Sequence, residues 1–289
     1  MKRCVLKLYQ SVQENKFEKL GKFLLIWGIL SFVSVIVTVL NTYVVPTLTG
    51  GWTIPFVDYI SIPVLVLNIL TLVSAKKLAK EEKSEEINKF ATLLIVALIT
   101  GFASTGIIVG STFFVTFRAL MTGSSTINIS GITLAANIAG VVELVAVGVA
   151  FLQLRAFFYR ELEGQGKGVA GSTVVFVGKM IAMGVLIFAG TPIALYTGEV
   201  YIDISTGTVS SAFDNFFSGP IALFATISLA GSIAANVLVL IGMVVSGNEL
   251  KLIAKQPVER DMAGTASQIA SPVTPGSTLP PGSKIMCNN

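Results

Sequence analysis

The chain has 289 residues, of which 53% are hydrophobic and only 12% are charged. A soluble domain carries about 25% charged residues, so the composition excludes an ordinary soluble protein and indicates a membrane protein. The formal net charge of +4 is not a nucleic-acid-binding signal, because the basic residues flank apolar runs instead of forming one patch. We expect these residues to lie against anionic lipid headgroups, with the bilayer as the main partner.

Four clusters hold all of the Lys and Arg residues except Arg118 and Lys179. They lie before residue 23, at 76–89, at 155–167 and in the C-terminal tail. Cytoplasmic loops of membrane proteins retain Lys and Arg. The clusters therefore predict a multi-pass protein of the cell membrane with both termini in the cytoplasm.

Six apolar runs are each long enough to cross a bilayer as a helix, which takes about 20 residues. They lie at about 22–45, 53–75, 90–117, 131–154, 169–193 and 217–246. The fold class that they predict is all-α, an integral membrane bundle of six transmembrane helices over residues 22–246.

The segments on either side of the bundle differ in character. Apolar residues recur at three- and four-residue steps over residues 1–21, which predicts a cytoplasmic interfacial amphipathic helix. Residues 247–289 are rich in Pro, Gly and Ser, with few large apolar residues towards their end. We expect this second segment to be a cytoplasmic, largely disordered tail.

Similar motifs follow the first, third and fifth spans. A Thr-Gly pair occurs at residues 49–50, 122–123 and 197–198. Each pair precedes an alternating stretch, which predicts short extended segments that pair across the outer loops, at 52–54, 126–130 and 201–205. Three helical-hairpin repeats are one explanation. The other is that Thr and Gly are common wherever helices turn at a membrane surface.

Two charged residues stand out because they lie deep within the apolar spans, Glu143 in the fourth and Lys179 in the fifth. A charge at mid-membrane costs about 3 kcal/mol or more, so each needs a partner or a purpose. The two residues lie about equally far from the loop at 155–168, and a helix rises about 1.5 Å per residue. They should therefore reach nearly the same depth, and we expect an ion pair across this hairpin.

The expected pair has two interpretations. It either locks the hairpin, as a buried ion pair does without adding net stability, or it forms a proton or ion relay in which Glu143 protonation alternates with pairing to Lys179. A transport pathway needs further polar groups in the spans. The candidates are Ser232 and Asn236 on one face of the sixth span, Asn137 in the fourth, and Asp58 in the second.

Other features of the spans are compatible with either interpretation. Asp58 lies near the outer surface, where reaching the headgroups is the alternative role. Pro63 and Asn68 combine a helix kink with a polar group, as transport paths and ordinary structural helices both do. Gly106 and Gly110 form a GxxxG motif that favours close helix packing or self-association into a homo-oligomer. Asn128 begins an Asn-Ile-Ser sequon, a glycosylation candidate on the outer face.

The residues needed for most catalytic sites are missing. The chain has no histidine, no P-loop and no G-x-S-x-G motif, and its carboxylates form no cluster that would hold a metal ion. We therefore expect no catalytic residues, no metal site and no cofactor, and do not expect an enzyme.

The stretch Arg155–Glu161, with sequence Arg-Ala-Phe-Phe-Tyr-Arg-Glu, precedes a Gly-rich start of the fifth span and, further on, a Pro-rich tail. In these features the second half of the chain resembles a family of uncharacterised multispan membrane proteins of thermophilic archaea. The resemblance is compositional, and the outer loops here are longer. It implies a helical membrane fold and no site residues.

The leading hypothesis is a transporter or channel-like subunit with Glu143 and Lys179 at its centre. The alternative is a non-transporting membrane anchor or scaffold subunit of a secretion, nucleic-acid-import or envelope complex. Transport predicts a water-accessible cavity that reaches Glu143. A scaffold predicts a dry interior packed with small residues, and a tail or outer loops that bind partner proteins.

Overall fold

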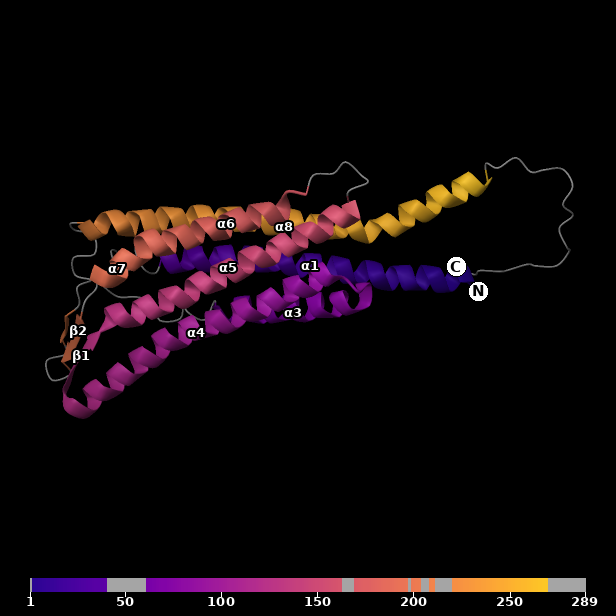
Figure 1. Ribbon diagram of the computed structural model, residues 1–289. Coiled ribbons are helices and arrows are strands. Elements are labelled where there is room, and N and C mark those ends of the chain that lie inside the picture. The colour runs from indigo at the N-terminus through magenta and orange to yellow at the C-terminus, as the bar shows by residue number, and fades with distance from the viewer. Residues whose placement is uncertain are drawn as a thin grey trace, which may run out of the picture. The chain divides into compact units, whose positions relative to one another are not determined.

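The computed structural model describes residues 2–40, 61–162, 169–196, 199–203, 208–210 and 220–269 (Figure 1). Met1–Ala254 form one compact unit and Lys255–Asn289 a second, and all contacts described below lie in the first. In chain order the elements are α1 (Lys2–Val39), α3 (Ser61–Glu82), α4 (Glu85–Thr122), β1 (Ser124–Asn128), α5 (Ile129–Leu162), α6 (Gly171–Val185), the π-helix η4 (Leu186–Gly190), α7 (Thr191–Tyr196), β2 (Glu199–Asp203), β3 (Thr208–Ser210) and α8 (Pro220–Ile269).

Six helices in the described part of the chain are long and apolar enough to cross a membrane. The candidate spans are Lys16–Val39, Ile62–Glu82, Glu85–Ser111, Ser130–Leu162, Gly171–Ile193 and Ala222–Ala254. The fifth combines α6, η4 and the start of α7. These findings confirm the predicted six-helix membrane bundle, and the protein is a multi-pass membrane protein.

Several helices extend beyond the apolar runs that predicted them. No proline interrupts residues 2–39, so the predicted amphipathic helix and the first span form one helix, α1. At the other end, α8 continues to Ile269, whereas a largely disordered tail was predicted from residue 247. The part up to Ala254 differs from the prediction because Leu250 and Ile253 are buried and hold the helix against the bundle. Residues 270–289 lie outside the described part.

The turn between α3 and α4 is defined by two adjacent residues. Lys83 has a φ of 49°, the left-handed conformation that commonly ends a helix. Ser84 then caps α4, because its hydroxyl oxygen accepts a hydrogen bond from the backbone N–H of Ile87 at 3.3 Å. Arg160 of α5 donates to both carboxylate oxygens of Glu86 at 2.7 Å. We call this end of the bundle, which contains the α3–α4 turn, the charged end.

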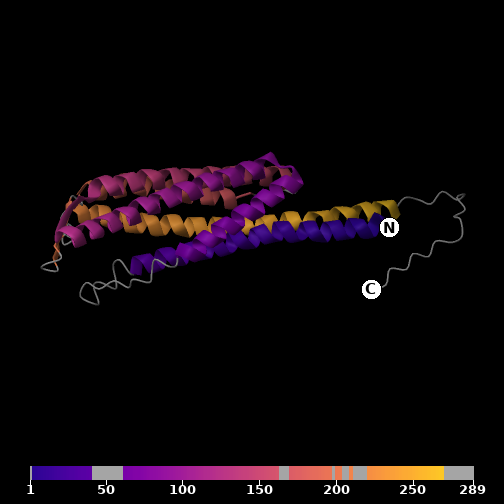
Figure 2. The ribbon, with the colours of Figure 1, turned by 90° about the horizontal axis from the view of Figure 1, so that it is seen from below.

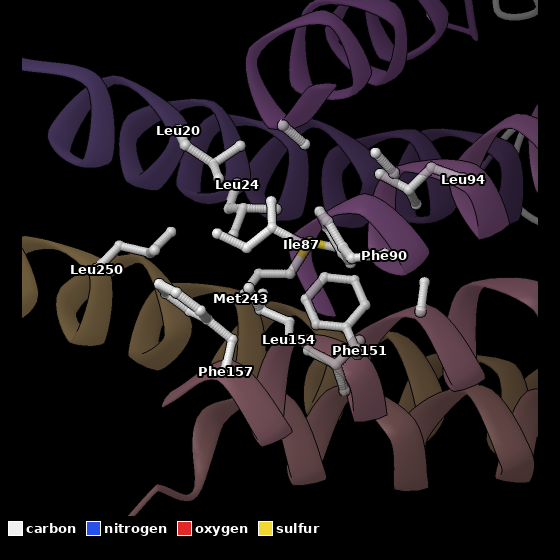
Figure 3. Close-up of a cluster of buried hydrophobic side chains, with 14 of the residues drawn as sticks. Leu20, Leu24, Ile87, Phe90, Leu94, Phe151, Leu154, Phe157, Met243 and Leu250 are labelled. Carbon is white, nitrogen blue, oxygen red and sulfur yellow. The ribbon is translucent and has the colours of Figure 1, made fainter. Parts of the chain in front are cut away.

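A cluster of buried apolar side chains joins all six membrane-spanning helices next to the charged end (Figure 3). Phe151 of α5 meets the ring of Phe90 of α4 edge-on, with centroids 5.6 Å apart. Phe157 of α5 stacks on Phe17 of α1 at 6.1 Å. Leu250 and Met243 of α8 belong to the same cluster. Such aromatic pairs add about 0.5–1.5 kcal/mol each beyond burial, so this cluster fixes the helix positions here.

Glycines bring α8 close to α1 and α6. A Cβ atom at Gly21 of α1 would lie 2.7 Å from the carbonyl oxygen of Gly247 of α8, so the two backbones touch. Figures 1 and 2 both show these two helices side by side. A Cβ atom at Gly178 of α6 would likewise lie 2.9 Å from the carbonyl oxygen of Ala235. Lipid gives no hydrophobic drive for helix association, so close packing of this kind holds the bundle together.

A buried carboxylate fastens α8 to the first turn of α6. Glu249 accepts hydrogen bonds from the backbone N–H groups of Ala170 and Gly171 at 3.0 and 3.2 Å. Next to it, the hydroxyl groups of Ser172 and Ser246 are hydrogen-bonded at 3.2 Å. Because the first N–H groups of a helix have no partner within it, Glu249 serves as a cap supplied by another helix.

The GxxxG motif of α4 does not pack as its sequence predicts. A Cβ atom at Gly106 or Gly110 would meet nothing within 4 Å. The side chains of Phe113, Phe114 and Phe117 in the same part of α4 are also exposed. Among the described residues, no helix packs on this motif, and its self-association stays a prediction.

A small antiparallel sheet lies at the opposite end of the bundle from the α3–α4 turn (Figure 1). β1 pairs with β2, with Thr126 opposite Tyr201, and β2 pairs with β3. The alternating sequences at 126–130 and 201–205 predicted extended segments that pair across loops, and this pairing agrees with that prediction. The third alternating stretch, 52–54, lies outside the described residues, so the threefold hairpin repeat stays a prediction.

Replacement by alanine should lower the stability of the protein at a glycine in a close helix contact. It should not do so at a glycine beside open space. Gly247→Ala places a methyl group against the backbone of Gly21, and overpacking of this kind costs about 1–3 kcal/mol. Gly106→Ala fills open space and gains helix propensity of about 0.5–1 kcal/mol. Thermal unfolding of the purified protein in detergent should therefore give a lower midpoint for Gly247→Ala and an unchanged or higher one for Gly106→Ala. Equal losses in both variants would contradict this assignment.

Candidate functional site

A partly open cavity of about 320 Å³ lies within the membrane-spanning part of the bundle. It is lined by residues of α1, α3, α4, α5 and α6. Trp27, Leu94 and Val147 belong both to its wall and to the buried apolar cluster. The tightly packed cluster therefore forms one boundary of the cavity, and the cavity begins where that packing ends.

Two opposite charges line this cavity, Glu143 from α5 and Lys179 from α6. The sequence predicted that both would reach the same depth, and the structure brings them to the same cavity. Both side chains remain partly accessible, and each lies within a candidate membrane span. The bundle thus contains a cation and a carboxylate that face one shared space.

The predicted ion pair between these residues is nevertheless not a direct one. Among the described residues, no salt bridge joins Glu143 to Lys179, and neither side chain has a hydrogen-bond partner. Gly101 of α4 explains the difference. A Cβ atom there would lie 3.1 Å from both Cδ and Oε2 of Glu143, so the carboxylate rests directly on the backbone of α4. Because glycine leaves this space free, Glu143 turns towards α4.

Three uncharged polar side chains also line the cavity: Ser31, Asn68 and Thr105. The Oδ1 atom of Asn68 is buried and accepts no hydrogen bond within the described part of the chain. A buried polar atom without a partner is rare in proteins and calls for an explanation, such as a bound water or ligand. Asn68 thus contributes to the cavity wall, while its Oδ1 atom is buried in the protein beside the cavity without a partner among the described residues.

Sequence reasoning pointed to Asn68 and did not find Ser31 or Thr105. The spacing held a usable signal, because residues four apart share a face of a helix. Thr105 follows Gly101 by one such step, and Ser31 follows Trp27 in the same way. The sequence could not show which of these faces would meet the helix that carries Glu143.

The other predicted site residues lie elsewhere. The amide nitrogen of Asn236 donates to the backbone oxygen of Ser232 in the same helix at 2.8 Å, and neither residue lines the cavity. Both residues thus lie outside this cavity, to which α8 contributes no lining residue, and their place on a pathway stays a prediction. Asn137 does not line the cavity either, and its amide nitrogen lies 3.6 Å from where a Cβ atom of Gly190 would be.

The remaining two predicted residues cannot be placed at the cavity. Asp58 lies outside the described residues. Asn128 is the last residue of β1, where it is opposite Glu199 of β2. The glycosylation of Asn128 stays a prediction.

The helix that carries Lys179 is interrupted two turns further along. η4 is a π-helix, and the backbone N–H of Thr191 donates to the carbonyl oxygen of Leu186, five residues earlier. Pro192 follows directly and has no N–H group to continue the normal ladder of hydrogen bonds. Such π-bulges are frequent at functional sites, and kinks often lie at them.

No family model matches this chain, and no curated protein or solved structure is significantly similar to it. The resemblance to the archaeal family therefore stays a prediction. Any function must be inferred from the cavity and the residues around it.

The contact between Gly101 and Glu143 can be tested by its dependence on the carboxylate. Gly101→Ala should destabilise the protein, because the new methyl group would lie against the Glu143 carboxyl group. In a Glu143→Ala background that clash is gone, and Gly101→Ala should be neutral or stabilising by about 0.5–1 kcal/mol. Thermal unfolding of the four proteins measures this coupling. The same loss in both backgrounds would mean that the carboxylate does not rest on Gly101.

Proposed function

We propose that this protein is a transporter or channel-like subunit of the cell membrane, and that the cavity at Glu143 and Lys179 is its solute or ion site. The observation that carries the proposal is a pair of opposite charges facing one cavity inside the membrane-spanning bundle. Ionisable residues in such positions are costly and usually belong to substrate or ion pathways. By the distribution of basic residues, the charged end and both termini face the cytoplasm.

The separation of the two charges favours a site over a structural lock. A lock would need good geometry between the partners to offset the loss of solvation of both charges. Here no salt bridge joins them within the described residues, while Asn68 also leaves its buried oxygen unpaired. Groups held apart around an open volume are what a binding site requires, since a ligand must supply the missing partners.

The π-helix in the fifth span supports the proposal, because it is a point at which the two halves of the span could tilt against each other. Transporter folds often bind their substrates beside discontinuous helices, whose broken hydrogen-bond ladder lets one half tilt against the other. η4 lies between Lys179 and the sheet end of its span. Bending at this point would change the position of the outer half of the span while Lys179 stays packed among its neighbours.

The second candidate is a non-transporting anchor or scaffold subunit of a secretion, nucleic-acid-import or envelope complex. The exposed half of α4 favours it, because Phe113, Phe114 and Phe117 lie beside the open glycines Gly106 and Gly110. A helix of a partner chain could pack there, although lipid would cover the same surface. This candidate does not explain the charged cavity.

A transporter exposes one site to both sides of the membrane, and this property can be measured. Replacing Cys4 and Cys287 by Ser gives a chain without cysteine, into which Thr105→Cys or Ser31→Cys is introduced. We expect a small membrane-impermeant methanethiosulfonate reagent to modify both positions in right-side-out vesicles and also in inverted vesicles. The labelled fraction is read by mass spectrometry of the purified protein.

The matched control is Ala150→Cys, because Ala150 is fully buried on the same helix as Glu143. It should remain unmodified from either side. Modification of the cavity positions from one side only would favour a closed crevice in a scaffold. Modification from neither side would mean a dry interior and would contradict the proposed function.

A further inference from the structure

The arrangement of charge around the cavity restricts what can occupy it. Lys179 and Glu143 both face the cavity without joining in a salt bridge. A purely cationic ligand would compensate Glu143 and would leave Lys179 uncompensated in a poorly solvated space. An anionic ligand would do the reverse. A ligand that carries both charges compensates both groups at once.

We infer that the cavity binds a small zwitterionic solute, with its carboxylate towards Lys179 and its ammonium group towards Glu143. This inference rests on the proposed transport function and names the class of solute that the site would take. An α-amino acid is the simplest molecule of this class, because its two charges are separated by a single carbon atom.

The polar side chains of the cavity wall can pair with both ends of such a solute. An ammonium group has three N–H donors, and the Glu143 carboxylate at the cavity can accept from them, with Asn68 also in the wall. At the other end, the Lys179 ammonium donates to a carboxylate, and the hydroxyl groups of Ser31 or Thr105 can add a second donor. The lining therefore holds complementary groups for each end of a zwitterion.

The remaining wall selects for an apolar side chain of limited size. Trp27, Leu94, Leu98 and Phe102 all line the cavity. Its volume of about 320 Å³ lies at the lower end of the range of about 300–1,000 Å³ for small-molecule sites. The space is large enough for a metabolite of the size of leucine.

The test compares three ligands that share the leucine side chain and differ in net charge, using the full-length protein purified in detergent at neutral pH. The probes are L-leucine, which is zwitterionic, L-leucinamide, which is cationic, and N-acetyl-L-leucine, which is anionic. Isothermal titration calorimetry measures the affinities, and thermal unfolding gives an independent readout. We expect leucine to bind about tenfold or more tightly than either analogue, because each analogue leaves one charge of the site unpaired.

Charge-removing variants should change the preference in a defined direction. Glu143→Gln should reduce leucine affinity and shift the preference towards N-acetyl-L-leucine, while Lys179→Met should shift it towards L-leucinamide. The control is Asn236→Ala, which removes a polar side chain bonded only within α8 and should leave all three affinities unchanged. The three-ligand comparison on the unaltered protein stands even if a variant does not fold.

The outcomes separate this inference from the function on which it rests. Equal affinity for the three ligands, or no binding of leucine, overturns the zwitterion inference. If Thr105→Cys is still modified from both sides of the membrane, the proposed transport function survives that result. If Thr105→Cys is modified from neither side, the function and the inference fail together.

Discussion

Hydrocarbon cannot solvate a charge, and this constraint governs how the interior of the bundle is built. Lys179 and Glu143 both lie within membrane spans, where an uncompensated charge costs about 3 kcal/mol or more. The protein reduces this cost by placing both groups on one partly open cavity, where water or a ligand can solvate them. The two groups form no direct salt bridge, so both can pair with a ligand in the cavity.

Small residues control where the bundle is tight and where it is open. At the crossings of α8 with α1 and α6, Gly247 and Gly178 let backbones touch, and the aromatic cluster fills the space next to the charged end. Gly101 has a different role, because the space it leaves is filled by the Glu143 carboxylate and not by another backbone. Glycine thus allows close helix packing at the α8 crossings, whereas at Gly101 it leaves space for a charged side chain.

Much of the fold could be predicted from the sequence, because the length of an apolar span follows directly from the thickness of the bilayer. The common depth of Glu143 and Lys179 also follows from helix rise alone. Orientation around each helix axis could not be predicted in this way. Whether Asn236 faces the cavity or its own backbone, and whether Gly106 meets a neighbour, depends on helix packing that one sequence does not specify. The direct ion pair failed as a prediction for the same reason, since the position of Gly101 beside the carboxylate is a tertiary contact.

The most direct measurement is a double-mutant cycle on Glu143→Gln and Lys179→Met, read as thermal stability of the ligand-free protein in detergent. A cavity that holds the charges apart predicts tolerated single variants and a coupling within about 1 kcal/mol. A structural lock predicts that each single variant loses about 3–5 kcal/mol, as breaking a buried pair does, and that the double variant recovers most of it. That second result would contradict the account of an open, ligand-binding site.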